Sequence, residues 1–407
     1  MKPISRIIFT SILATISTIF FISLFLSGTT AKAQQQVFHA HISESIQSSV
    51  IVTPSVYLPI IQKPAPPVPT GQGALFVSDR AEPEKYDIYS MDLQGNNVAR
   101  LTNLGIDSYA GFSHRFLPQW SPDGTRIAVQ IDKAIYIMLS DGSQVEPLYE
   151  KLNDAAVSIP AWSPDGSKIA FVAKNCLEPR PSCNITTGGG VRVIDVQTKA
   201  ITQVIPDNIA MDPFNDVAWT PDGLSVLAVP HEGYGGDDTG IIVGYLDGTP
   251  AKWILSGYFP EEFEISPDGQ KIAFIKGDNV SAHTANIDGN NVNPVYSGLP
   301  DKFVYDITWH PSGNRVAYAV TQSTGVNRTI YTANVDGSNA QDILPSNHSS
   351  SLRVWGWTPD GSKILFYSDR NRTYRHHDIF IVNETGGNPT NLTANSPEDD
   401  VLADYRP

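Results

Sequence analysis

The segment 369–377 gathers more reactive side chains than any other part of this sequence. It reads Asp-Arg-Asn-Arg-Thr-Tyr-Arg-His-His, in a chain whose formal net charge is −14. Guanidinium groups bind carboxylates and phosphates through paired hydrogen bonds, and a tyrosine ring can cover a sugar. The segment could therefore bind an anionic or sugar-bearing partner. The alternative is a solvated loop whose arginines pair with Asp79 or Glu82.

A second candidate lies in the segment 231–238, His-Glu-Gly-Tyr-Gly-Gly-Asp-Asp. Its oxygens could bind Ca²⁺, but the ordered acidic spacing of an EF-hand loop is missing. A flexible glycine-rich connection is the favoured interpretation.

The sequence holds none of the common catalytic signatures. There is no Gly-x-Ser-x-Gly elbow, no His-Glu-x-x-His pair, no phosphate loop and no dinucleotide fingerprint. We therefore expect a non-catalytic binding protein without a cofactor, whose partner is a protein or a glycan. A nucleic-acid partner is not expected, because no basic run follows the N-terminus.

The elements that would position these loops are marked by six copies of one turn. Successive copies lie 42, 57, 46, 44 and 48 residues apart, counted from the residue before each proline. Proline, aspartate and glycine in this order form a tight turn between two strands. A period of this length predicts propeller blades. The copies are Trp120–Gly124, Trp162–Gly166, Trp219–Gly223, Ile265–Gly269, Trp309–Gly313 and Trp357–Gly361.

Each turn is followed by a short strand of alternating pattern, such as Arg126–Val129 or Lys168–Phe171, which we expect to be half-buried. Two further strands complete each unit, and seven such sets begin near Leu75 and end near Thr393. The strand that completes the first set should come from the C-terminus, which would close the ring. The sequence therefore predicts an all-β, seven-bladed propeller of four-stranded antiparallel blades over 73–407, with six blades as the alternative.

In such blades, lettered A to D, the A–B and C–D turns lie on one face and the B–C and D–A connections on the other. Here the first set is short and uniform and the second is long and irregular, so binding residues are expected on the loop face. Ring closure should bring 370–377 close to Arg80. The candidate ligand-binding residues are Arg80, Glu82, His114, His231, Tyr234, Arg370, Arg372, Tyr374, Arg375, His376 and His377.

These repeats resemble the WD40-like repeats of TolB-type propellers, and the strand ends Phe76–Arg80 and Phe366–Arg370 share the Phe-x-Ser-Asp-Arg pattern typical of that group. TolB itself carries an α/β domain before its propeller, which is missing here. The resemblance to oligogalacturonate lyases of similar repeat type implies the alternative function, a metal-dependent polysaccharide lyase-like enzyme with histidines over the central channel. Prolyl peptidases would need a hydrolase domain after residue 407.

The N-terminal part differs from the repeats. Residues 1–33 combine Lys2 and Arg6, an apolar run and Ala31-Lys32-Ala33, which predicts a secretory signal peptide, with an uncleaved anchor as the alternative. Residues 34–72 form a proline-rich linker. A secreted, periplasmic or cell-surface location follows, with membrane contact only through an uncleaved N-terminal segment.

Two cysteines, Cys176 and Cys183, lie in one loop. Closely spaced thiols in an exported protein usually pair, so a disulfide is expected. A metal site would need further ligands that are not nearby in the sequence.

Overall fold

The computed structural model describes residues 73–406, with gaps at 108–116, 132, 151–153, 157, 177–185, 211–213, 231–239, 259, 278–279, 299–301, 323–327, 345–350, 370–375 and 397. The signal peptide, the linker and Cys183 lie outside the described residues. The predictions for them, including the disulfide, therefore remain predictions. No described residue belongs to a helix long and apolar enough to cross a membrane.

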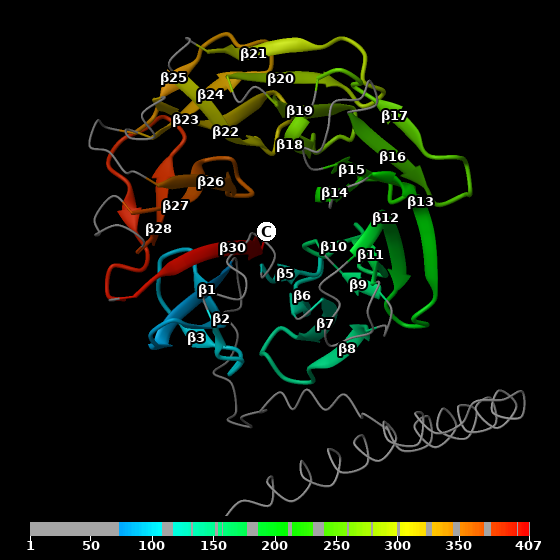
Figure 1. Cartoon of the computed structure of the whole chain (residues 1–407). Helices are drawn as coiled ribbons and strands as arrows, with labels where there is room; N and C mark the ends of the chain where they lie inside the picture. The colour runs from blue at the N-terminus through cyan, green and yellow to red at the C-terminus, as the bar shows by residue number, and fades with distance from the viewer. Residues whose placement is uncertain are drawn as a thin grey trace, which may run out of the picture. The chain divides into compact units, whose positions relative to one another are not determined.

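Seven antiparallel sheets surround a common centre in this part of the chain (Figure 1). This confirms the seven-bladed prediction and excludes six blades. From the innermost strand outward, the first blade is β30 (Asp400–Arg406), β1 (Gly73–Glu82), β2 (Lys85–Asp92) and β3 (Ala99–Arg100), with β4 (Ile106–Asp107) also paired to β2.

Blades 2 to 4 follow in chain order. Blade 2 contains β5 (Gln119–Trp120), β6 (Arg126–Ile131), β7 (Ala134–Leu139) and β8 (Glu146–Tyr149). Blade 3 contains β10 (Ala161–Trp162), β11 (Lys168–Cys176), β12 (Thr186–Asp195) and β13 (Ile201–Ala210), with β9 (Asp154–Ala156) paired to β11. Blade 4 contains β14 (Phe214–Trp219), β15 (Ser225–Pro230), β16 (Ile241–Tyr245) and β17 (Lys252–Ile254).

Blades 5 to 7 repeat the same order. Blade 5 contains β18 (Pro260–Ile265), β19 (Lys271–Lys276), β20 (Ser281–Asn286) and β21 (Asn293–Ser297). Blade 6 contains β22 (Lys302–Trp309), β23 (Arg315–Gln322), β24 (Thr329–Asn334) and β25 (Gln341–Asp342). Blade 7 contains β26 (Leu352–Trp357), β27 (Lys363–Ser368), β28 (Asp378–Asn383) and β29 (Thr390–Asn391).

The ring closes as the sequence predicts. Strand β30 pairs antiparallel with β1, from Gly73 opposite Arg406 to Ser78 opposite Asp400. The first blade is therefore built from both ends of the propeller, and β1 is paired on both of its edges.

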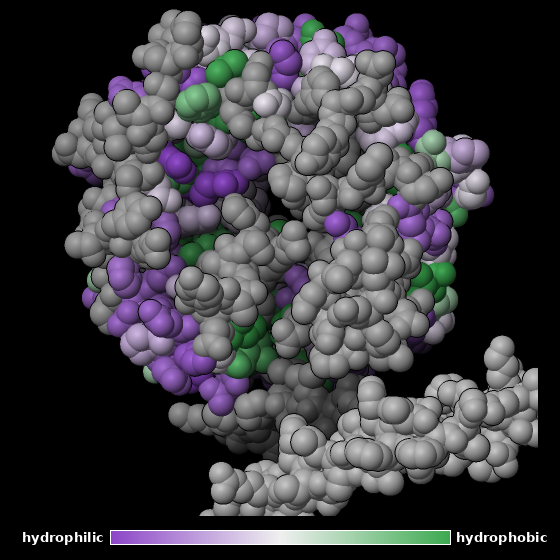
Figure 2. Space-filling view, viewed as in Figure 1, coloured by the Kyte–Doolittle hydropathy of each residue, from purple (hydrophilic) through white to green (hydrophobic). Residues whose placement is uncertain are grey.

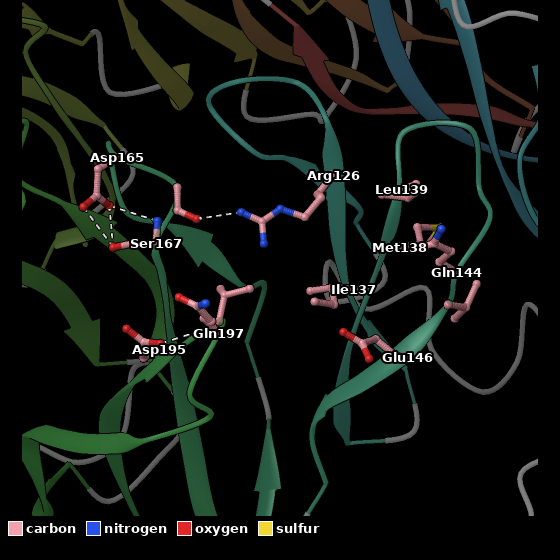
Figure 3. Close-up of a pocket in the computed structure, with 13 residues that line it drawn as sticks. Arg126, Ile137, Met138, Leu139, Gln144, Glu146, Asp165, Ser167, Asp195 and Gln197 are labelled. Atoms are coloured by element: carbon pink, nitrogen blue, oxygen red, sulfur yellow. Dashed lines mark hydrogen bonds between the residues drawn. The ribbon is translucent and has the colours of Figure 1, made fainter.

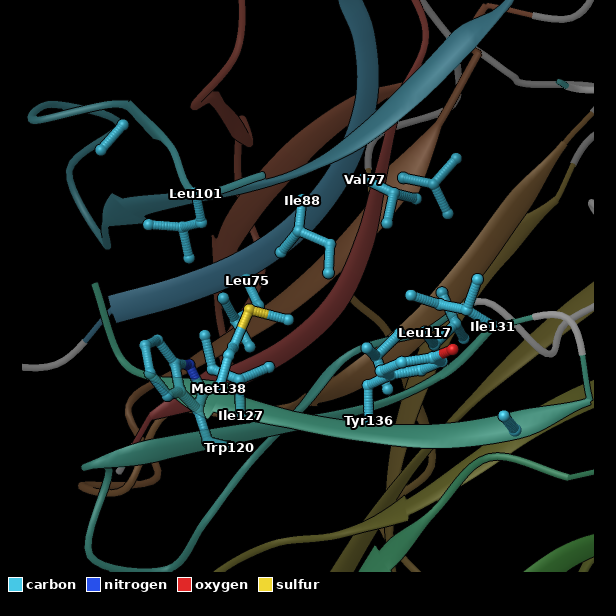
Figure 4. Close-up of a cluster of buried hydrophobic side chains, with 14 residues drawn as sticks. Leu75, Val77, Ile88, Leu101, Leu117, Trp120, Ile127, Ile131, Tyr136 and Met138 are labelled. Atoms are coloured by element: carbon cyan, nitrogen blue, oxygen red, sulfur yellow. The ribbon is translucent and has the colours of Figure 1, made fainter. Parts of the chain in front are cut away.

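The hydrophobic core is divided into layers between neighbouring blades. In β6, Ile127 and Val129 pack in the layer toward blade 1, whereas Ala128 packs in the layer toward blade 3 (Figure 4). The second strands were expected to be half-buried, but both of their faces are covered, because each blade lies between two others. Large residues on one face and alanine on the other let adjacent blades approach closely.

The Pro-Asp-Gly turns have the hydrogen bonds that their residue types predict. Asp165 Oδ1 accepts from the Ser163 hydroxyl at 2.6 Å and from the Ser167 N–H at 3.0 Å, and Gly166 has a positive φ of 67°. These aspartates are therefore turn formers.

Candidate functional site

Four of the candidate residues, Arg80, Glu82, His376 and His377, are described, and they lie where the ring closes between blades 7 and 1. The others lie outside the described residues and stay predictions: His114, His231, Tyr234, Arg370, Arg372, Tyr374 and Arg375. Glu82 is exposed at the end of β1, and His376 is half-buried.

Arg80 joins the first strand of the propeller to its last strand. Its guanidinium forms an ion pair of 2.7 Å with Asp400, whose side chain is completely buried. It also stacks over Phe76, at 4.8 Å from the ring centroid, and Tyr89, at 5.2 Å. Burial raises the pKa of Asp400, and Arg80 opposes that rise. An anionic partner would therefore compete with an internal carboxylate for this arginine.

His377 joins blade 7 to the start of the closing strand. Its Nδ1 lies 2.9 Å from an Asp399 carboxylate oxygen, and its Nε2 lies 2.9 Å from the Ser351 hydroxyl. Asp399 also accepts from the His377 backbone N–H at 2.7 Å and from the Tyr86 hydroxyl at 3.0 Å. We call Ser351, His377, Asp399 and Tyr86 the seam cluster.

The seam cluster has the order of groups used in nucleophilic catalysis. When His377 is neutral and Nδ1–H donates to Asp399, Nε2 can accept the Ser351 proton. The side chains of His377 and Asp399 are only 17% and 10% exposed, so the relay is largely shielded from water. The arrangement can therefore act as a structural bridge between two blades or as a base that activates a serine.

Sequence reasoning missed Ser351 and Asp399 because no motif links them. They do occupy equivalent places, just before the innermost strands of blades 7 and 1. The aspartate of each Ser-Asp-Arg strand end accepts the corresponding backbone N–H: Asp369 from Ser351 at 3.0 Å, and Asp79 from Asp399 at 3.0 Å. Aligning the repeats could have placed the two residues on adjacent blades.

A second polar group lies on three consecutive innermost strands. Arg353 on β26 pairs with Glu262 on β18 at 2.7 Å and with Asp306 on β22 at 2.6 Å. Asp306 is a non-glycine residue with a positive φ of 47°, at a bulge in β22. Such strain in a bulge is frequent near functional sites. We call these three residues the channel cluster.

The carboxylates of the channel cluster also cap backbone groups of the next blade. Glu262 accepts the Asp306 N–H at 3.0 Å, and Asp306 accepts the Val354 N–H at 2.9 Å. Innermost strands belong to different sheets, so their inner edges need partners of this kind. Burial raises the pKa of Asp306 to about 7, Arg353 opposes that rise and Glu262 adds to it.

Tyr367 lies between the two clusters. It is the cross-strand neighbour of Arg353, and its ring meets the His377 imidazole edge-on with centroids 5.3 Å apart. Burial raises its pKa to about 12. The space-filling view shows a hollow near the middle of the disk with hydrophilic residues beside it (Figure 2). Tyr367 thus connects the channel cluster on the innermost strands with the seam cluster.

The described residues contain no group of three or more His, Cys, Asp or Glu arranged to hold a metal ion. Three histidines of the propeller segment that could contribute to a metal site, His114, His231 and His348, lie outside the described residues.

No known family model and no curated protein matches this sequence. Solved structures do match its fold. A prolyl endopeptidase is 10% identical with a TM-score of 0.59, and the match covers 81% of this chain and 48% of that one. TolB from Acinetobacter baumannii is 21% identical with a TM-score of 0.45, over 68% of this chain and 64% of TolB. An oligogalacturonate lyase in complex with manganese is 15% identical with a TM-score of 0.42, over 78% and 73%.

The match to the prolyl endopeptidase shows the propeller fold, in agreement with the TolB-type repeat pattern of the sequence. This chain spans about half the length of the prolyl endopeptidase and less than two thirds of TolB. Similarity at this level does not carry a substrate or a reaction to this chain.

Proposed function

We propose that this protein is a secreted or envelope-associated propeller that binds a protein or glycan partner through its loop face and performs no chemistry of its own. The observation that carries the proposal is the difference between the two faces. The face of the short turns is used for packing between blades, whereas the opposite face bears the seam cluster and Arg80 with its buried partner.

The packing role of the turn face is visible at the glycines of the C–D turns. A Cβ on Gly142 would lie 2.1 Å from the Leu101 carbonyl oxygen, and one on Gly95 would lie 2.4 Å from that of Leu392. Each of these turns therefore rests directly on the outermost strand of the preceding blade. A rigid scaffold on one face and variable loops on the other is the usual arrangement of a binding module.

The proposal is tested by capture of envelope proteins and glycans on the full-length protein, with and without a chelator. Replacing Arg372 and Arg375 with alanine should weaken capture while the melting temperature stays unchanged. Lys271→Ala with Lys363→Ala removes the same charge from the turn face and should leave capture intact. Equal capture by both double variants would contradict binding through the loop face. Loss of capture with chelator would favour the metal-dependent alternative.

The geometry of the seam cluster favours acyl hydrolysis as a second candidate function. Ser351 Oγ would attack an ester carbonyl while His377 takes its proton. The alcohol would leave with that proton, and water would release the acid from Ser351. A fluorophosphonate probe separates the two candidates. Labelling that disappears in Ser351→Ala and in His377→Gln would support hydrolysis, and an unlabelled, folded wild-type protein would exclude it.

A further inference from the structure

Blade 3 departs from the repeat at its C–D turn. In the six other blades a glycine with positive φ occupies the left-handed position: Gly95, Gly142, Gly248, Gly289, Gly337 and Gly386. The turn of blade 3 is one residue longer, and its left-handed residue is Lys199, with φ 58°, whose N–H donates to the Asp195 carbonyl four residues earlier. Its turn also closes differently, since the Asp195 N–H donates to the Ala200 carbonyl.

This longer turn without glycine changes how blade 3 meets blade 2. Lys199 has a Cβ, so the turn cannot approach the neighbouring outer strand as the turns of Gly95 and Gly142 do. Its ammonium instead reaches the Pro147 carbonyl at 3.1 Å. A pocket of about 710 Å³ opens between the two blades on the turn face (Figure 3). This volume lies within the range of small-molecule sites.

The pocket combines apolar surface with one guanidinium. Ile137 from blade 2 and Val196 from blade 3 are buried side chains of its lining, and both belong to the hydrophobic layer between these blades. Arg126 extends across the opening, donates to the Gly166 carbonyl at 3.0 Å and stacks over Trp162 at 5.1 Å (Figure 3). Within the described part of the chain, no carboxylate forms an ion pair with Arg126.

At the junction of blades 6 and 7, the corresponding arginine has an internal carboxylate partner. Arg315 is the counterpart of Arg126: it begins the second strand of its blade and lies over Trp357 at 5.9 Å. Its guanidinium pairs with Glu384, from the C–D turn of the next blade, at 2.5 Å.

Val196 occupies the place of Glu384 in blade 3. Each donates its backbone N–H to the residue that follows the Pro-Asp-Gly turn of its own blade: Val196 to Ser167 at 2.9 Å, and Glu384 to Ser362 at 3.0 Å. The carboxylate that satisfies Arg315 is therefore replaced by an apolar side chain beside Arg126.

Three carboxylates also line the pocket, and their charges have to be weighed. Asp165 and Asp195 are hydrogen-bonded within their own turns, to the Ser163 hydroxyl at 2.6 Å and the Thr198 N–H at 2.8 Å, and Glu146 is exposed. The Arg315 site also has a turn aspartate nearby, because Asp360 occupies in the Pro-Asp-Gly turn of blade 7 the position that Asp165 occupies in blade 3. Glu384 pairs with Arg315 nonetheless, so such surroundings tolerate an additional carboxylate.

We propose that the pocket between blades 2 and 3 binds a small monocarboxylate with an apolar body. The ligand's carboxylate takes the position that Glu384 holds against Arg315 and forms a charge-assisted pair with Arg126. Its apolar body rests on Ile137 and Val196. This site is independent of the partner proposed for the loop face.

The probe is 3-phenylpropionate, with 3-phenylpropionamide as the uncharged match, titrated into the full-length protein by calorimetry and ligand-observed NMR. We expect the acid to bind at least tenfold more tightly than the amide. Arg126→Gln should weaken acid binding at least tenfold. Arg315→Gln, the matched control, should leave it unchanged.

Val196→Glu gives blade 3 a carboxylate at the position that Glu384 holds in blade 7. This variant should no longer bind the acid. Equal affinity for acid and amide, unchanged affinity in folded Arg126→Gln, or no binding of the acid to the wild-type protein would each overturn the proposal. Because Val196 is buried, the melting temperature of Val196→Glu is measured first. If Val196→Glu does not fold, the result for Arg126→Gln alone tests the proposal.

Discussion

Two sets of aspartates in this propeller have pKa values shifted in opposite directions. On the turn face, Asp165 and Asp360 accept hydroxyl and backbone N–H groups within their own turns, and the serine or threonine hydroxyl is the main cause that lowers their pKa to about 2. On the innermost strands, burial raises the pKa of Asp306 and Asp404 to about 7. The first set is stabilised by local hydrogen bonds that form with each turn. The carboxylates of the second set are costly to ionise because they are buried. Contacts from neighbouring blades must offset this cost.

The largest effect should come from breaking the pair that closes the ring. Arg80→Ala leaves the fully buried Asp400 without its cation, which should lower the free energy of unfolding by about 3–5 kcal/mol. Urea unfolding at pH 7 measures the loss. Arg100→Ala is the matched control: Arg100 is 35% exposed against 19% for Arg80, and its buried partner Asp87 keeps hydrogen bonds from Thr102 and Leu104, so this change should cost less. Equal losses would show that Asp400 does not depend on Arg80.

An intermediate effect should appear in the pH dependence of the channel cluster. The raised pKa of Asp306 favours its protonated form in the folded state, so its contribution to stability is complete below pH 3.8 and is lost as the pH rises toward 7. Asp306→Asn removes this loss. The unfolding free energy of the variant relative to wild type should therefore rise between pH 4 and pH 7, by about 1.4 kcal/mol for each unit of pKa shift. A difference that is constant over this range would contradict the raised pKa.

The smallest effect should come from a turn aspartate. Asp165→Ala removes the acceptor for Ser163 and Ser167 and should cost about 1 kcal/mol at pH 7. The lowered pKa means that this contribution is present above pH 3.8 and is lost as the pH falls through about 2. Asp165→Ser should cost less, since Ser312 stands in the corresponding turn of blade 6. Thermal unfolding at pH 7 and pH 2 measures the loss of stability of both variants and how it changes with pH.

The blades and their closure could be predicted because the signals are local. Each turn sequence fixes its own backbone, and the spacing between turns fixes one blade. The seam cluster could not be predicted in the same way, since Ser351, His377 and Asp399 meet only after the ring has closed. The sequence does show that the turn Asp195–Ala200 of blade 3 lacks the glycine found in the other C–D turns. What that absence creates depends on how two blades pack, so the pocket required the structure.

The pairing of β1 with β30 also has a consequence for the order of events during folding. Gly73 finds its partner only when Arg406 has been synthesised, so the most distant contact in the propeller must form to complete the first blade. Closing so long a loop is slow compared with forming a hairpin. Until then β1 keeps an open edge that can pair with another chain. We therefore expect residues 400–406 to limit aggregation of the nascent protein, and a truncation there to lower its solubility before it affects binding.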